Sequence, residues 1–254
     1  MKKLVLLTPL ALALSTPTFA DEVIDPADVT NVYTQTALMV SGDSSLLWQG
    51  QVAGGMENGQ QFALLAEATF DNEDNDSNKF GLDYQNSRVQ YFHVFDTGIN
   101  STPKAGVSFD YINTRTNAVK NDLLAVGGVA AVNPASVGGL LVFPMANVIA
   151  GNMELADGTK DDLTGFGASL ITAKYIGDTG AYVVVTPEIQ NLSGDTLDVQ
   201  NITVKTGLNA PLNSNRSTWI NTRFDFAKST ISVNGTDLDA DWETKAWLGV
   251  RHDF

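Results

Sequence analysis

Apolar and polar residues alternate with a period of two through several segments of the chain, including 46–56, 62–71, 107–111 and 220–226. Successive side chains of an extended strand point to opposite faces, so each segment has one apolar face and one polar face. Strands of a membrane-spanning barrel alternate in this way, because one face meets lipid and the other meets the lumen. The pattern predicts an all-β fold whose strands separate two environments.

Turn-forming residues divide the chain into about twelve such segments, and ten or fourteen strands also fit the pattern. We predict a transmembrane antiparallel up-and-down β-barrel, for which an even strand number is expected. A secreted β-sandwich or jelly roll also alternates and is the alternative fold. The expected strands are 32–41, 45–56, 61–71, 80–95, 105–112, 122–132, 140–150, 164–175, 181–190, 197–208, 217–227 and 241–254.

The most apolar region, 123–149, is interrupted by Asn133-Pro134, by Gly138-Gly139 and by Pro144. These residues favour two strands joined by a turn. Both faces of 123–132 are apolar, so a helical hairpin stays open as an alternative there.

Residues 1–20 have the features of a secretory signal peptide. Lys2 and Lys3 precede an apolar stretch too short to span a bilayer, and small residues at Thr18 and Ala20 suit cleavage before position 21. We therefore expect one barrel domain, 21–254. Removing the two lysines leaves 13 basic residues against 29 acidic ones, a net charge of −16, which disfavours nucleic acid as a partner. Cysteine is absent, which excludes disulfides and thiol catalysis.

The last segment, 243–254, alternates up to a terminal phenylalanine. It resembles the C-terminal strand of Gram-negative outer-membrane β-barrels, small porin-like proteins among them, which typically end in Phe after alternating apolar or aromatic residues. His252 departs from that pattern. The resemblance implies an outer-membrane location, contact with membrane lipid and lipopolysaccharide, and passage through periplasmic chaperones and the barrel-assembly machinery. It assigns the membrane-insertion signal to Leu248, Val250, His252 and Phe254.

A twelve-strand barrel places the odd-numbered connections outside the cell. These include the longest and most acidic segments, 71–78, 113–121, 151–162 and 229–240, whereas 57–60, 133–137 and 177–180 are short turns on the periplasmic side. Aromatic residues near strand ends, such as Trp48, Trp219, Trp242, Tyr175 and Tyr182, fit the two membrane interfaces.

No sequence motif predicts an enzyme, a cofactor or a metal site. The acidic runs at 71–76 and 237–241 fail the calcium-loop pattern, and we interpret them as solvated loops. His93 lacks the His-x-Ser pair of outer-membrane phospholipases, and His252 lies at a periplasmic end. We expect both histidines to be structural.

The polar faces of the strands predict a lumen of mixed charge. One interpretation is a porin-like channel for passive diffusion of small polar solutes or ions. The alternative is a sealed, salt-bridged barrel that acts through loops 151–162 and 229–240. A third alternative is a lipid- or peptide-modifying barrel enzyme, which would need a nucleophile or an acid pair beside a histidine at the extracellular rim, and the sequence has no such set of residues. A bulge near Asn86–Arg88 would reconcile the two parities of 80–95, and leaves the facing of Arg88 and His93 open. The expected lining residues are Gln49, Gln51, Glu67, Asp110, Glu188, Asn201, Lys205, Asn221, Arg223, Asp225, Glu243, Lys245 and Arg251.

Overall fold

The computed structural model describes residues 34–71, 82–239 and 241–254. The described chain is almost entirely β-strand, with one short 3-10 helix, η1 (Pro134–Ser136). The strands are β1 (Thr34–Ser41), β2 (Leu46–Gly55), β3 (Gln61–Asp71), β4 (Asp83–Ile99), β5 (Thr102–Arg115), β6 (Val119–Ala131), β7 (Leu141–Leu155), β8 (Lys160–Tyr175), β9 (Tyr182–Ser193), β10 (Leu197–Pro211), β11 (Thr218–Val233), β12 (Thr236–Asp239) and β13 (Glu243–Asp253).

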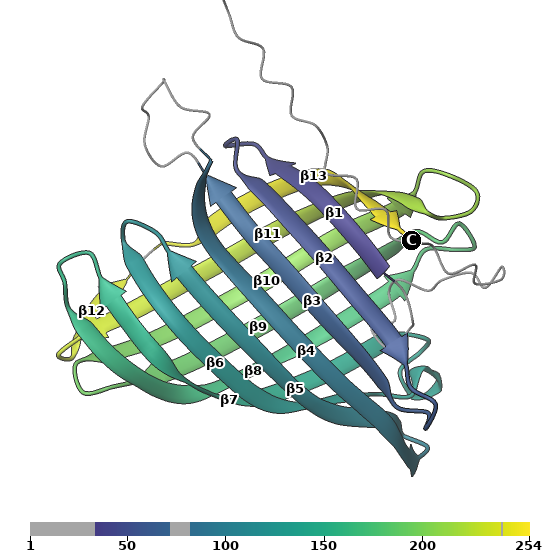
Figure 1. Cartoon of the computed structure of the whole chain (residues 1–254), viewed down its shortest axis with the longest axis horizontal. Coiled ribbons are helices and arrows are strands. Elements are labelled where there is room, and N and C mark those ends of the chain that lie inside the picture. The colour runs from purple at the N-terminus through teal and green to yellow at the C-terminus, as the bar shows by residue number, and fades with distance from the viewer. Residues whose placement is uncertain (1–33, 72–81, 240) are drawn as a thin grey trace, which may run out of the picture.

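Every strand pairs antiparallel with its neighbours, and the sheet closes on itself through β11, β13 and β1. β12 and β13 both pair with β11, so they are two parts of one barrel strand. The result is a closed barrel of twelve strands, which confirms the predicted architecture (Figure 1). In the part of the chain that the structure describes, no helix is long and apolar enough to cross a membrane.

The apolar region that left a helical hairpin open forms β6 and β7. The turn between them contains η1, where Pro134 occupies the first turn and the Asn133 side chain accepts a hydrogen bond from the Ala135 backbone N–H. Pro134 cannot donate to a strand ladder, and the Asn133 side chain caps the first turn, so these two residues begin the short helix.

The barrel has two distinct ends (Figure 1). At the terminal end, β1 begins and β13 stops, and the Phe254 backbone N–H donates to the Thr34 carbonyl at 2.8 Å. At the distal end lie the β1–β2 turn and the β11–β12 hairpin. Residues 72–76 of the predicted acidic run lie outside the described residues.

The prediction of long loops is wrong for three segments. Segments 113–121, 151–162 and 229–240 are mainly strand, and the turns inside them shrink to 116–118, 156–159 and 234–235. Strands of 15 and 16 residues, as in β7 and β8, exceed the ~9–11 residues that cross a bilayer. Their distal parts keep the backbone ladder beyond the lipid-facing band, where no lipid enforces an apolar face.

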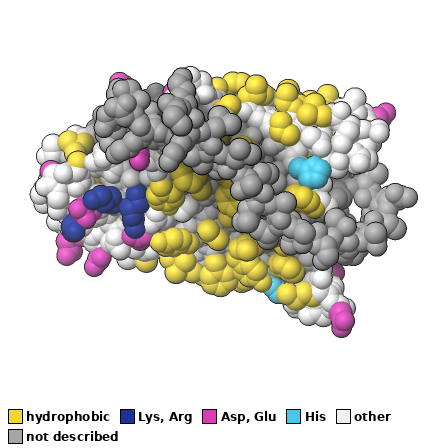
Figure 2. Space-filling view, turned by 45° about the horizontal axis from the view of Figure 1, so that its top comes forward, with side chains coloured by type: hydrophobic (Ala, Val, Ile, Leu, Met, Phe, Trp, Pro, Cys, Tyr) yellow, Lys and Arg dark blue, Asp and Glu magenta, His cyan; other side chains and the backbone are white. Residues whose placement is uncertain are grey.

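The outward face of the barrel is apolar along its middle. Large outward side chains such as Val52, Phe109, Val148 and Phe224 are 43–67% exposed. Figure 2 shows hydrophobic side chains spread over the middle of the molecule, with Lys and Arg gathered toward the left end and Asp and Glu toward both ends. This surface fits the hydrocarbon of a membrane.

Three aromatic side chains that we expected at the membrane interfaces lie inside the barrel instead. Trp219 and Tyr182 are buried, and Tyr175 packs against them. They fill one side of the terminal end, while Phe92, Phe143 and Met145 fill another. Leu163, Leu192 and Leu197 fill part of the distal end. Apolar packing therefore narrows the lumen at both ends.

Candidate lumenal site

Arg88 of β4 is the centre of a buried charged cluster in the lumen. Its guanidinium donates to both carboxylate oxygens of Asp110 on the neighbouring strand β5, from Nε at 3.0 and 2.8 Å and from Nη2 at 2.5 Å. Its Nη1 donates to Glu188 Oε2 on β9 at 2.9 Å. A planar guanidinium can bind two carboxylates at once because its five N–H groups form a rigid fork.

A second set of pairs is centred on Glu67 of β3. Its carboxylate accepts from Arg223 Nη1 at 3.2 Å and from Gln49 Nε2 at 3.2 Å, and lies 3.6 Å from Lys205 Nζ. Arg223 Nε also donates to Asp225 at 2.6 Å. Each charge is thus paired, as buried charges must be.

Both sets cross the bore. On the shorter way round the barrel, β5 to β8 lie between Arg88 and Glu188, and β2, β1, β13 and β11 lie between Glu67 and Lys205. We call these seven side chains the transverse layer: Glu67, Arg88, Asp110, Glu188, Lys205, Arg223 and Asp225.

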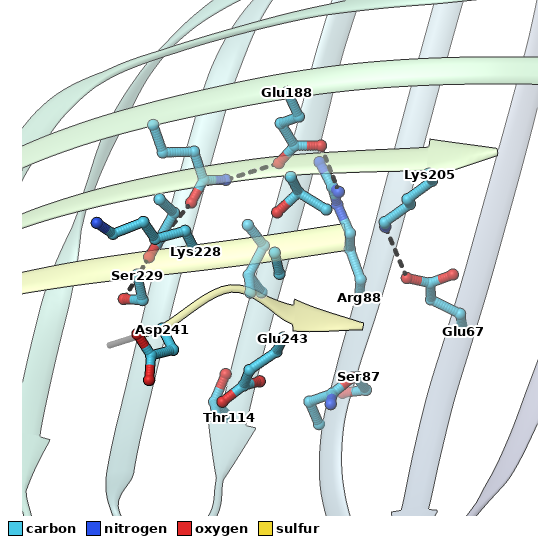
Figure 3. Close-up of a pocket in the computed structure, with 16 residues that line it drawn as sticks. Glu67, Ser87, Arg88, Thr114, Glu188, Lys205, Lys228, Ser229, Asp241 and Glu243 are labelled. Carbon is cyan, nitrogen blue, oxygen red and sulfur yellow. Dashed lines mark hydrogen bonds and ion pairs between the residues drawn. The ribbon is translucent and has the colours of Figure 1, made fainter. Parts of the chain in front are cut away.

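Two polar cavities adjoin the transverse layer. A distal cavity of about 260 Å³ is lined in part by hydroxyl side chains such as Ser87, Thr114 and Ser229 (Figure 3). A terminal cavity of about 280 Å³ is lined by Gln49, Thr186 and others. Both share Glu67, Arg88, Glu188 and Lys205. The layer therefore divides the polar lumen into two compartments.

The predicted lining residues all lie on the inner side of the barrel, in three groups. Six belong to the transverse layer. Asn201 and Glu243 line the distal cavity, with Lys245 near the distal mouth. Gln49, Asn221 and Arg251 line the terminal cavity, and Gln51 is buried beside Gln35.

Lys245 is held at the distal mouth by two carboxylates. Its Nζ lies 3.1 Å from Asp43 and 3.2 Å from Asp71, and it also donates to Ser45 Oγ. Burial alone would raise the pKa of Asp43, but hydrogen bonds from Ser41, Lys245 and Ser45 hold it below its usual range. Asp43 therefore stays ionised well into acid.

Arg251 belongs to the aromatic packing of the terminal end. Its guanidinium lies 4.5 Å from the centre of the Trp219 ring, donates to the Tyr182 hydroxyl at 2.7 Å and pairs with Asp253 at 2.8 Å. Only 3% of Arg251 is exposed. This geometry gives it a packing role in addition to its charge.

Arg88 is the main lumenal residue that the sequence left unassigned. The β3–β4 register shifts where Thr69 pairs with Asn86 and Phe70 pairs with Tyr84, so Gln85 is the extra residue of a bulge. The bulge lies next to the predicted position and turns Arg88 inward. His93 faces away from the layer, where its Nε2 lies 2.8 Å from Gln60 Oε1.

The remaining predicted residues lie outside the lumen. Leu248, Val250 and Phe254 project outward, each more than half exposed, and His252 stacks edge-on against Phe254 at 4.7 Å. Among the described residues, no group of three or more His, Cys, Asp or Glu side chains is arranged to hold a metal ion.

The barrel resembles solved outer-membrane barrels at low sequence identity. The KdgM porin is 12% identical over 88% of this chain and 99% of that chain, with a TM-score of 0.41. The anion-selective porin from Comamonas acidovorans is 11% identical over 88% and 97%, with a TM-score of 0.36. The β domain of the Bordetella autotransporter Brka is 10% identical over 87% and 98%, with a TM-score of 0.40. No family model and no curated protein matches the chain. The likeness is one of barrel architecture.

Proposed function

We propose that this protein is an outer-membrane channel for the passive diffusion of small polar solutes or ions. The observation that carries the proposal is the pair of polar cavities that meet at the transverse layer inside a closed barrel. The outward apolar band supports a membrane location, and closure of the sheet leaves no unpaired edge in lipid.

The orientation follows the predicted one. The distal end faces the exterior and the terminal end faces the periplasm. Residues 1–20 act as the cleaved signal peptide. The insertion signal read by the assembly machinery consists of Leu248, Val250, His252 and Phe254. The outer surface meets lipid and, in the outer leaflet, lipopolysaccharide. The proposal assigns no catalytic residue and no cofactor.

Selectivity is set where the lumen is most charged. The transverse layer contains four acidic side chains and three basic ones, so it carries a small excess of negative charge. A lining of this sign attracts cations, and the paired basic residues limit the preference. We therefore propose weak cation selectivity.

A sealed barrel remains the second candidate, because every charge of the layer is paired, two of the ion pairs, Arg88–Glu188 and Glu67–Arg223, cross the bore, and apolar clusters narrow both ends. The loop-presenting form of that candidate loses support from the short turns at 156–159 and 234–235. Planar-bilayer recording separates the two candidates: a channel gives discrete current steps, whereas a sealed barrel of verified fold stays silent.

A further inference from the structure

We infer that the Arg88 side chain gates the lumen. We call this side chain the bar, its contact with Asp110 the anchor and its contact with Glu188 the latch. The bar stays bound to Asp110, and solutes pass when the contact with Glu188 breaks. The inference deepens the proposed channel function and rests on it. It assigns different roles to two carboxylates that bind the same guanidinium, so it can be tested by the sign of their effects.

The anchor is the stronger side of the contact. Arg88 makes three hydrogen bonds to Asp110, and β4 and β5 are neighbouring strands whose pairing fixes the two residues relative to each other. The bond to Glu188 is a single one, from Nη1 at 2.9 Å, and it joins strands on different sides of the bore. The crossing contact is therefore the first to break.

The Glu188 carboxylate is held in position by a second partner, so the Arg88 side chain can bind it again. Gln190, two residues further along β9, donates from Nε2 to Glu188 Oε1 at 2.9 Å, which leaves Oε2 for Arg88 (Figure 3). This contact lies on the wall of β9, so it survives when Arg88 moves away.

When the Arg88–Glu188 bond breaks, neither charged group is left without a hydrogen-bond partner. Arg88 keeps its bidentate partner Asp110, and Glu188 keeps Gln190 while it lines both cavities. Breaking a buried ion pair is costly when one partner is left unpaired. Here each partner retains a hydrogen bond, so an open state is accessible.

Two further contacts cross the bore, and both reach Glu67. Arg223 Nη1 donates to Glu67 Oε2 at 3.2 Å, and Lys205 Nζ lies 3.6 Å from Glu67 Oε1. Both are longer than the Arg88–Glu188 bond at 2.9 Å, so each restrains the lumen less than that bond does. The bar on Arg88 should therefore dominate the closed state.

The test compares Glu188→Gln with Asp110→Asn in single-channel recordings of the folded full-length barrel. Each variant removes one carboxylate charge and keeps the side-chain size. Without the latch charge, Arg88 settles on Asp110 at the wall, and the open fraction should rise about tenfold, as the loss of one charge-assisted hydrogen bond implies. Without the anchor charge, Arg88 depends on Glu188, and the open fraction should fall.

Asp122→Asn is the matched control. Asp122 pairs with Arg115 at 2.7 Å at the distal end, outside the lumenal cavities, so its loss should leave the open fraction unchanged. Equal increases in Glu188→Gln and Asp110→Asn would overturn the latch and leave the channel standing. If the native protein passes a steady current that neither variant alters, the latch is likewise overturned and the channel function stands. Silence of the native protein and of Glu188→Gln would overturn both proposals.

A cysteine pair keeps the gate testable if Asp110→Asn does not fold. The chain has no cysteine of its own, so Arg88→Cys with Glu188→Cys creates a single reactive pair. The pair lacks the bar and should conduct freely. A reducible bifunctional thiol linker should close it, and reduction should reopen it. A barrel that stays silent before cross-linking would contradict the gate.

Discussion

Inward-facing glycines show how single residues allow the barrel wall to curve. A Cβ atom at Gly165 of β8 would lie 1.9 Å from the backbone oxygen of Asn191, and one at Gly127 of β6 would lie 2.1 Å from that of Ala146. These contacts are with the backbone of paired strands and cannot be relieved by a rotamer change. The alternation of the sequence does not reveal this requirement, because a glycine fits either face.

Gly165→Ala should therefore destabilise the barrel by about 1–3 kcal/mol, the usual cost of overpacking. Gly42→Ala is the control, since a Cβ there meets nothing within 4 Å. Unfolding by urea in lipid vesicles, followed by tryptophan fluorescence, measures both. Equal stability of the two variants would contradict a steric role for Gly165.

The two members of a pair in the transverse layer should shift ion selectivity in opposite directions. Arg223→Ala removes a positive charge and leaves Glu67 and Asp225 less compensated, so the preference for cations should increase. Glu67→Ala removes a negative charge and should decrease it. Reversal potentials under a salt gradient measure the change.

Lys160→Ala, a substitution of an exposed charge beside the β7–β8 turn, should leave the reversal potential unchanged. Unchanged potentials in both lumenal variants would remove the layer from the permeation path.

Strand β4 shows what could be predicted about an element and what could not. Its two parities indicated a bulge, and the structure has one at Gln85. The facing of Arg88 could not be decided, because a shift of one residue moves every following side chain to the other face. The distal ends of β7 and β8 could not be located from the sequence either, since polar residues beyond the lipid give no alternating pattern.

The β1–β2 turn should depend on pH through Asp43. The pKa of this carboxyl is lower in the folded protein than its ordinary value near 4, so its contribution to stability is present above that value. The contribution declines as the pH falls from about 4 toward the folded pKa. Asp43→Asn should therefore lower stability modestly at pH 7, and the difference from the native protein should shrink in stronger acid.

Unfolding curves at pH 7 and in increasingly acid buffer test this expectation. Asp178→Asn, in the turn between β8 and β9 at the opposite end of the barrel, is the control. If the difference in stability between Asp43→Asn and the native protein does not change with pH, the charge of Asp43 is not what stabilises the turn.

For the whole molecule, the sequence predicted a closed barrel of twelve strands and a polar interior, because both follow from alternation and turn chemistry. It could not predict which residues meet across the bore. That depends on strand tilt and stagger, which bring Arg88 to Glu188 and Glu67 to Lys205 from strands that are not neighbours. The apolar packing around Leu163 and Leu192 was hidden for a related reason: an inward leucine carries no sign of the partners it will meet.

Planar-bilayer recording of the folded native protein beside Glu188→Gln, under a salt gradient, decides whether the lumen conducts. We expect discrete current steps with weak cation selectivity, and a larger open fraction in Glu188→Gln. Two correctly folded barrels that both stay silent would show that the transverse layer seals the lumen and that the protein is not a channel.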